Sequence, residues 1–216
     1  MRKRDAIIDF RGKIEVMMTD NKNTWDKLLK IKTTGRDDSN ADQYRYPYEP
    51  TPYSVLERLA NSGFIRKRDV VLDYGCGKGR VDFFLSYQTK VDSIGIEYDE
   101  RIYQSLLENQ KTAVSGEKTE FVQIRAEEYK VPSKVNRYYF FNPFSVELLQ
   151  KVMARIVESY YEKPRELFLF FYYPSKEYIS YLMTVDELEF YDEIACGDLF
   201  DDKDLRERIM IFKIPY

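Results

Sequence analysis

Histidine is absent from the 216-residue sequence, and cysteine is scarce. Without histidine, the chain has no imidazole general base, no histidine-based catalytic triad and no histidine ligand for a metal. The two cysteines, Cys76 and Cys196, are too few for a disulfide framework or for a four-cysteine metal site. We therefore expect no metal centre, and any catalysis must proceed without imidazole.

Long apolar segments are missing as well. The longest stretches without a charged residue, 138–146 and 167–175, have nine residues each, whereas a helix needs ~20 residues to span a membrane. The apolar residues near the start of the chain are interrupted by Asp9 and Arg11, so we identify no signal peptide. These features predict a cytoplasmic protein without membrane contacts.

The charges are unevenly distributed along the chain. The formal net charge is −3 and the isoelectric point is about 5.3, which argues against a globally basic nucleic-acid-binding protein. Residues 1–13 nevertheless carry five bases and two acids, and residues 186–204 carry nine acids and one lysine. Such runs are usually solvated faces, but the basic start leaves contact with an anionic partner open. The sequence does not reveal the oligomeric state.

From Val70 onward, short β-rich segments alternate with helical patterns, as expected of βαβ units and a parallel sheet. Strands are predicted at 70–74, 92–97, 120–124, 136–142 and 166–173, and helices near 79–88, 99–112, 145–160 and 175–184. Residues 187–195 and 206–214 alternate in polarity without an intervening helix, which indicates an antiparallel pair. The predicted fold is α/β: a doubly wound, mostly parallel sheet of seven strands with a C-terminal antiparallel hairpin and a helical N-terminal extension.

Residues 1–51 do not follow this alternation. They contain predicted helices around 3–18 and 23–31, then a loop and the segment YRYPYEPTPY, whose prolines favour an extended path. Thr51 and Pro52 suit the N-cap and first turn of a helix that Gly63 would end. We therefore divide the chain into a helical, aromatic N-terminal lid at 1–51 and an α/β domain at 52–216.

The segment VVLDYGCGKGR at residues 70–80 places glycines at every second position: Gly75, Gly77 and Gly79. Glycines so closely spaced allow sharp turns and a close approach of a ligand to main-chain N–H groups. A nucleoside triphosphate loop would need Lys and then Ser or Thr after its last glycine, and a dinucleotide loop spaces its last two glycines differently. Asp73 favours a cationic ligand, because its carboxylate would repel a phosphate.

This glycine segment resembles the first motif of the class I (Rossmann-like) S-adenosylmethionine-dependent methyltransferases, the pattern hydrophobic-Asp-x-Gly-x-Gly-x-Gly. The resemblance implies that S-adenosylmethionine is the cofactor and that Glu97, at the end of the second strand, accepts hydrogen bonds from both ribose hydroxyls. By position, the small residue and acid after the third strand match the family's adenine contacts. The resemblance assigns cofactor binding to Asp73, Gly75, Cys76, Gly77, Gly79, Glu97, Tyr98, Ala126, Glu127 and Asn142.

The fourth strand ends in Asn142-Pro143-Phe144, which resembles the family's fourth motif: Asn or Asp, Pro, Pro, then Tyr or Phe. In amino-methylating members the Asn side chain and a following carbonyl accept hydrogen bonds from the target amine, and the aromatic ring packs on the substrate. One proline is missing here, so the pattern does not match the adenine- or glutamine-methylating members specifically. Alternatively, Asn142 and Pro143 form a turn that only caps the next helix.

Residues 46–53 are similar to the Tyr-x-x-Thr-Pro approach segment of some lysine-directed and uncharacterised bacterial members. The rings of Tyr46, Tyr48 and Tyr53, with Phe144, would surround a sulfonium. Glu49 or a tyrosine hydroxyl would orient a neutral amine and receive its proton late. The predicted catalytic residues are Tyr48, Glu49, Asn142, Pro143 and Phe144.

The predicted function is therefore methyl transfer from S-adenosylmethionine to an unidentified acceptor, an amine on a small molecule or on a protein side chain. Two alternatives stay open: a non-catalytic S-adenosylmethionine-binding module that recruits a protein partner, and a nucleic-acid methyltransferase. An NAD-dependent oxidoreductase is disfavoured by the glycine spacing.

Overall fold

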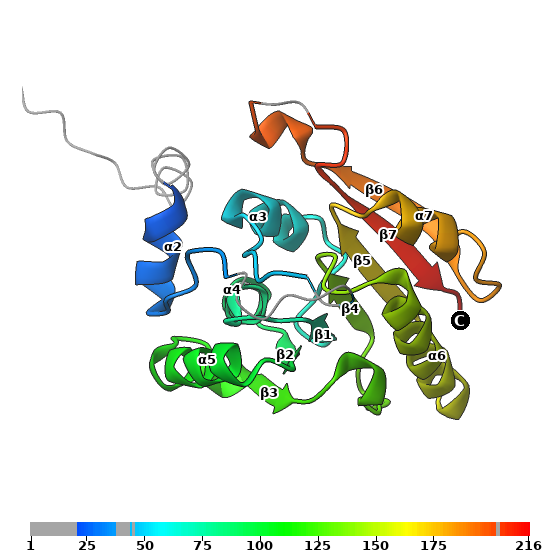
Figure 1. Ribbon diagram of the computed structural model, residues 1–216, viewed down its shortest axis with the longest axis horizontal. Helices are drawn as coiled ribbons and strands as arrows, with labels where there is room; N and C mark the ends of the chain where they lie inside the picture. Colours follow the sequence, from blue (N-terminus) through cyan, green and yellow to red (C-terminus); the bar gives the residue numbers. More distant parts are fainter. Residues whose placement is uncertain (1–20, 38–43, 45, 202–203) are drawn as a thin grey trace, which may run out of the picture.

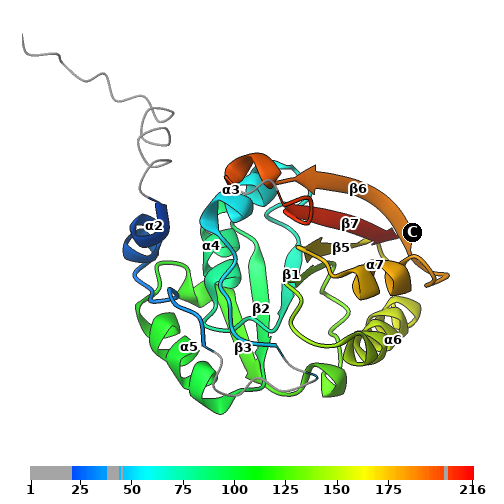
Figure 2. The same ribbon diagram turned by 45° about the horizontal axis from the view of Figure 1, so that its top comes forward.

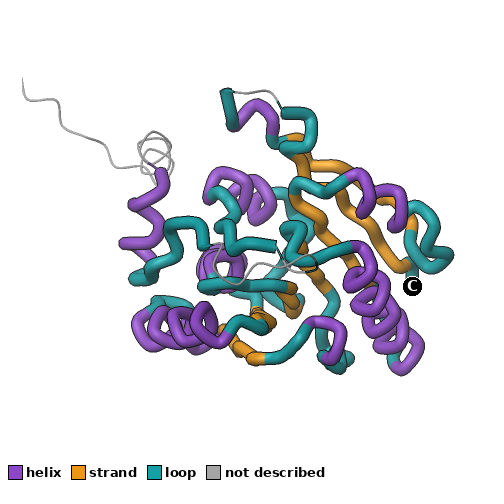
Figure 3. Tube along the Cα trace, in the orientation of Figure 1, coloured by secondary structure: helices purple, strands orange, loops and turns teal. Residues whose placement is uncertain are grey.

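The computed structural model describes residues 21–37, 44, 46–201 and 204–216. The helix predicted around 3–18 and most of the loop that follows residue 37 lie outside the described residues. The second predicted helix is present as α2 (Asn21–Leu29), and the chain between α2 and α3 (Tyr53–Asn61) runs mostly as loop (Figure 3). None of the described helices is long and apolar enough to cross a membrane.

A seven-stranded sheet forms the centre of the molecule. Its strands are β1 (Val70–Tyr74), β2 (Asp92–Glu97), β3 (Thr119–Gln123), β4 (Arg137–Phe140), β5 (Leu167–Tyr172), β6 (Glu189–Ala195) and β7 (Arg208–Ile214). The order in the sheet is β3-β2-β1-β4-β5-β7-β6, with β1 to β5 parallel and β7 antiparallel to both neighbours. The predicted fold class is confirmed, including the antiparallel pair at the C-terminus.

Helices cover both faces of this sheet, as Figures 1 and 2 show. The helices that follow α3 are α4 (Arg80–Thr89), α5 (Glu100–Thr112), α6 (Val146–Glu162) and α7 (Lys176–Leu182), with short 3-10 turns η1 (Gly116–Lys118), η2 (Ala126–Glu128) and η3 (Gly197–Leu199). Helices α2 to α5 lie on one side, and α6 and α7 lie on the other. This arrangement is doubly wound, as predicted.

The strands are apolar on successive residues because both faces of the sheet are buried. In β1, Val71 packs toward α3 and α4, whereas Leu72 packs toward α6. In β4, Tyr139 and Tyr138 divide in the same way between the two clusters. The sheet is therefore a rigid base, and the ligand site of such folds lies at the carboxyl ends of its parallel strands.

The start of α3 differs from the prediction. Pro52 is the N-cap residue, and Thr51 does not cap the helix. Instead, Thr51 Oγ1 lies 3.0 Å from the hydroxyl of Tyr139, so that a contact with the sheet takes the place of the cap. The predicted end of α3 is confirmed, because Gly63 follows the helix with a φ of +84°.

Arg80, the first residue of α4, joins the N-terminal segment to the sheet. Its guanidinium is buried and donates hydrogen bonds to Thr33 Oγ1 (2.7 Å) and to the Thr51 carbonyl (3.1 Å). Its Nη2 lies 3.8 Å from Asp26 Oδ1 in α2. The Asp26 carboxylate also accepts hydrogen bonds from the Thr33 backbone (2.6 Å) and from the Tyr53 hydroxyl (2.5 Å). A buried charge is thus fully surrounded by partners.

Helix α2 also contributes to the core. Leu29 is fully buried, and the Trp25 ring meets Phe84 edge-on with ring centroids 4.9 Å apart. Trp25 Nε1 donates to Glu57 Oε1 over 2.6 Å. Helix α2 is therefore packed on α3 and α4, and the role of residues 1–51 as a lid stays a prediction.

The Arg80 network gives a first prediction. Arg80→Ala should lower the free energy of unfolding by about 3–5 kcal/mol, because it leaves the Asp26 carboxylate buried without its cation. Urea unfolding followed by circular dichroism measures this loss. Arg155→Ala is the control, since Arg155 forms an ion pair with Glu158 in which both side chains are about half exposed, worth at most about 1 kcal/mol. Similar losses in the two variants would contradict the structural role of Arg80.

Candidate active site

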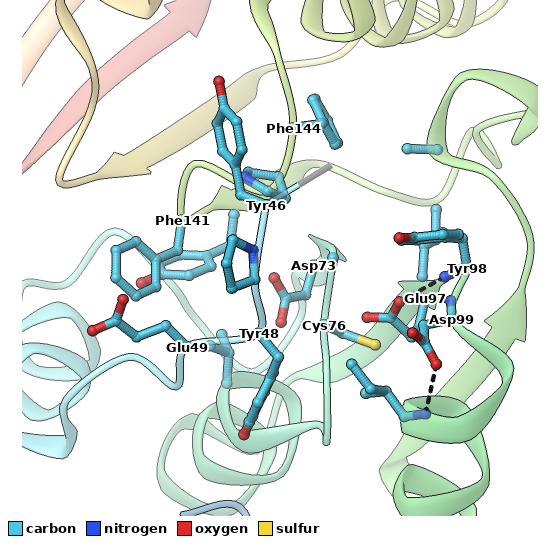
Figure 4. A pocket seen from close by; sticks show the side chains of 18 of the residues that line it. Tyr46, Tyr48, Glu49, Asp73, Cys76, Glu97, Tyr98, Asp99, Phe141 and Phe144 are labelled. Carbon is cyan, nitrogen blue, oxygen red and sulfur yellow. Dashed lines mark hydrogen bonds between the residues drawn. The ribbon is translucent and has the colours of Figure 1, made fainter. Parts of the chain in front are cut away.

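A cleft opens at the carboxyl ends of β1, β2 and β4, beneath the extended segment of residues 46–51. Figure 4 shows Asp73 near its middle, between Tyr46, Tyr48 and Glu49 on one side and Glu97, Tyr98 and Asp99 on the other. The predicted site residues that line the cleft are Tyr48, Glu49, Asp73, Gly75, Cys76, Glu97, Tyr98, Ala126, Glu127, Pro143 and Phe144. Gly77, Gly79 and Asn142 are not among the lining residues.

The glycine loop needs its glycines for two reasons. Gly75, Gly77 and Gly79 all have positive φ angles, of 74°, 56° and 83°, which side-chain-bearing residues rarely adopt. A Cβ at Gly77 would overlap the ring of Tyr48, and a Cβ at Gly75 would lie 2.6 Å from Pro143 Cβ. The loop is thus both left-handed and closely covered by the opposite wall of the cleft.

Glu97 is fixed at the end of β2 by main-chain donors. Its Oε2 accepts a hydrogen bond from the Gly77 N–H (3.0 Å), and its Oε1 accepts from Tyr98 (2.8 Å) and Asp99 (2.9 Å). Burial raises the pKa of Glu97 to about 7, although these three donors act in the opposite direction. The carboxyl group is therefore well oriented and titrates near neutral pH.

Asp73 has an acidic neighbour that the sequence did not suggest. Burial, followed by the adjacent Asp82 carboxyl, raises the pKa of Asp73 well above its usual range. Burial also raises the pKa of Asp82 to about 7. Asp82 Oδ1 accepts from Ser93 Oγ (2.5 Å), but its buried Oδ2 has no hydrogen-bond donor among the described residues. Two adjacent buried carboxyls of this kind share a proton.

The cleft is strongly acidic. Among the residues that the structure describes, one base lines it, Arg80, and this guanidinium is already engaged with Asp26. The acidic lining residues are Asp37, Glu49, Asp73, Glu97, Asp99 and Glu127. Such a lining attracts a cation and repels a phosphate.

The extended segment over the cleft is held by its backbone. Tyr46 N–H donates to the Pro143 carbonyl (3.2 Å), and Tyr48 exchanges two main-chain hydrogen bonds with Asp37 (3.0 and 3.1 Å). The Tyr48 hydroxyl donates to the Thr33 carbonyl (2.6 Å), and burial raises the pKa of this phenol. Tyr48 is therefore a neutral residue of the cleft wall, and its hydroxyl donates a hydrogen bond to the protein backbone.

The side chain of Asn142 is engaged outside the cleft. Its Nδ2 donates to the Tyr173 carbonyl (2.5 Å), and its Oδ1 accepts from the Ser175 N–H (3.3 Å). The carbonyl of Pro143 accepts from Tyr46, as described above. Both groups that amino-methylating enzymes turn toward the target amine are bonded to this chain's own backbone. The assignment of Asn142 to the acceptor and the cofactor stays a prediction.

Other residues of the site were missed or were expected in another place. The Tyr53 ring was expected around the sulfonium but lies 4.4 Å from the Arg80 guanidinium, outside the cleft lining. Asp99 was missed, although its position before α5 is a recognisable N-cap: its Oδ1 accepts from the Ile102 N–H (3.1 Å). Phe141 and Asp37 carried no local signal, since only the folded chain brings them to the cleft.

Asn142 gives a second prediction. Asn142→Ala should lower the free energy of unfolding by about 1–3 kcal/mol, because the Tyr173 carbonyl and the Ser175 N–H lose their partners. Its affinity for S-adenosylhomocysteine should match that of the parent protein. Urea unfolding and titration calorimetry measure the two quantities. Weaker binding at unchanged stability would instead place Asn142 among the cofactor contacts.

Comparisons with known proteins complete the description. No family model matches the sequence. A protein-lysine N-methyltransferase of Saccharolobus islandicus (strain REY15A) is 36% identical over 72 residues, which cover 32% of this chain and 45% of that protein. The match thus spans less than half of the relative's length.

Solved structures give a likeness over most of the chain. An RNA methyltransferase from Salinibacter ruber, in complex with S-adenosyl-L-homocysteine, has a TM-score of 0.51 at 18% identity and covers 77% of this chain and 94% of its own. A TehB-like SAM-dependent methyltransferase from Corynebacterium glutamicum has a TM-score of 0.54 at 15% identity, with coverages of 74% and 88%. The strand order and these likenesses show that the chain has the fold of the class I S-adenosylmethionine-dependent methyltransferases.

Proposed function

We propose that this protein binds S-adenosylmethionine and transfers its methyl group to a lysine amine of a protein. The observation that carries the proposal is the Glu97 carboxylate, oriented by the Gly77 N–H at the edge of the sheet where this fold binds its ligand. A carboxylate in this place suits the two hydroxyls of a ribose. When bound, the cofactor supplies an electrophilic methyl group on a positively charged sulfur.

The residues present fit this cofactor. Asp73 and the other carboxylates of the cleft would favour its sulfonium and ammonium groups. Ala126 and Glu127 lie beside the cleft in η2, where an adenine would be held. The glycine loop adds no side chains of its own to the cleft, and Tyr48 and Pro143 lie close against it.

The charge of the cleft supports an amine acceptor over a nucleic acid. In the described part of its lining there are six acidic residues and one engaged arginine. Asp37 is paired with Arg101, but the other acids would still repel an approaching phosphate backbone. A lysine ammonium would be attracted. The name of the Saccharolobus islandicus relative, a protein-lysine N-methyltransferase, points to the same acceptor class.

The chain's own residues would then prepare the acceptor. A lysine amine must be neutral to act as a nucleophile, and Glu49, an exposed carboxylate on the wall segment, would orient it and receive its proton. Phe144 is buried at the opposite wall and Tyr46 stands at the rim, so that their rings would exclude water from the reacting centre. Neither role requires histidine or a metal.

The direct test is methyl transfer to lysine. The protein should incorporate label from methyl-tritiated S-adenosylmethionine into a mixture of lysine-containing peptides, and amino-acid analysis should identify methyllysine. Glu97→Ala should weaken S-adenosylhomocysteine binding by about 10- to 100-fold, since a charge-assisted acceptor is lost. Glu193→Gln, an exposed residue of β6, is the control.

Two results would overturn the proposal at different levels. Parent protein that does not bind S-adenosylhomocysteine would refute the cofactor. Label that appears in RNA or DNA, with none in the peptides, would refute the lysine acceptor alone.

The raised pKa of Glu97 predicts a pH dependence of cofactor binding. Glu97 is protonated below about pH 7, and a bound ribose favours the ionised form. Affinity for S-adenosylhomocysteine should therefore fall as the pH drops from 8 to 6, by a factor that approaches ten per unit below the pKa. Glu97→Gln should show a flatter profile in titrations across this range. An identical profile in the variant would exclude Glu97 as the titrating group.

A further inference from the structure

A second cavity lies on the other side of the extended segment that covers the cleft. It opens where β4 and β5 end, and the segment of residues 46–52 forms the wall between the two cavities. Five residues line both of them: Tyr46, Pro47, Glu49, Pro50 and Phe141. In Figure 4, Glu49 and Phe141 lie on the side of Asp73 away from Glu97. A single extended segment therefore separates the two cavities.

Five of the described residues that line the second cavity are aromatic. They come from the wall segment, from the ends of β4 and β5 and from the residue after η3, and they are Tyr46, Phe141, Tyr172, Tyr173 and Phe200. The Tyr46 ring is 47% exposed, so it is open to a binding partner. Aromatic faces carry negative electrostatic potential and attract ammonium and guanidinium groups.

The charged residues of this cavity also favour a cation. Among the described residues, Glu49 and Glu207 line it together with one base, Arg36. Arg36 and Glu49 form a pair 3.6 Å apart, but both side chains are more than half exposed, and such pairs contribute little. Glu207 is held by the Tyr172 hydroxyl, which donates to it over 2.6 Å. A cation entering the cavity would meet an oriented carboxylate.

Because the two cavities share five lining residues, one extended peptide could reach both of them. Side chains at positions i and i+2 of a strand leave the same face about 7 Å apart, and neighbouring strands lie about 5 Å apart. Two such side chains can therefore enter cavities that are separated by a single extended segment. Adjacent side chains leave opposite faces and cannot.

We propose that the second cavity binds a lysine side chain of the protein substrate, two residues away from the lysine that is methylated. This inference rests on the proposed function, because the methylated lysine occupies the first cleft. The exposed Tyr46 and the Glu207 carboxylate recognise the second ammonium. The wall segment then sets the distance between the recognised and the reacting lysine.

The test uses full-length protein with bound S-adenosylhomocysteine and three peptides. They are acetyl-Gly-Lys-Gly-Lys-Gly-amide, the same peptide with norleucine for the second lysine, and acetyl-Gly-Lys-Lys-Gly-Gly-amide. Titration calorimetry should show at least fivefold tighter binding of the first peptide than of the other two. Glu207→Gln should remove most of this preference, whereas Glu193→Gln, on exposed β6, should keep it.

The outcomes separate this inference from the proposed function. Equal binding of the three peptides, or a preference that survives in folded Glu207→Gln protein, would overturn the second site. Methylation of all three peptides at equal kcat/KM would also overturn the second site, but it would support the proposed methyltransferase activity. Preferential binding without any methylation would support the second site and refute lysine methylation.

Discussion

The buried guanidinium of Arg80 is the interaction on which the shape of the cleft depends. A desolvated charge is stable only where partners surround it, and Arg80 finds them in three separate parts of the chain. Asp26 lies in α2, Thr33 lies in the loop after it, and the Thr51 carbonyl precedes α3. Because Arg80 directly follows the glycine loop, one side chain aligns that loop with the segment opposite to it.

The second constraint is the concentration of buried carboxyl groups beside this arginine. Asp73, Asp82 and Glu97 are all less than a tenth exposed, and each has a raised pKa because burial disfavours its charged form. At Glu97 the free protein lowers this cost through three main-chain donors. A cation in the cleft would lower it further. The same acids that destabilise the free fold therefore favour a positively charged ligand.

The sequence predicted the sheet and the glycine loop well, because both leave local signals. Successive apolar residues marked the strands, and glycines at every second position marked the turn. No local sequence signal marked the proximity of Asp82 to Asp73 or the partners of Arg80. In both cases the contacting residues are far apart in the sequence or belong to another element. Asn142 illustrates the limit: its motif was visible, but its hydrogen bonds to Tyr173 and Ser175 depend on how β5 ends.

The extended wall segment links recognition to the reacting centre. Pro47, Pro50 and Pro52 have no N–H group, so this segment cannot become an inner strand of a sheet, and it stays a single layer. Two of its other N–H groups, those of Tyr46 and Tyr48, donate to the Pro143 and Asp37 carbonyls. The segment is held at Tyr46 and Tyr48, and one of its faces lines each cavity. Because the segment lines both cavities, a shift of it toward one of them would narrow that cavity and widen the other.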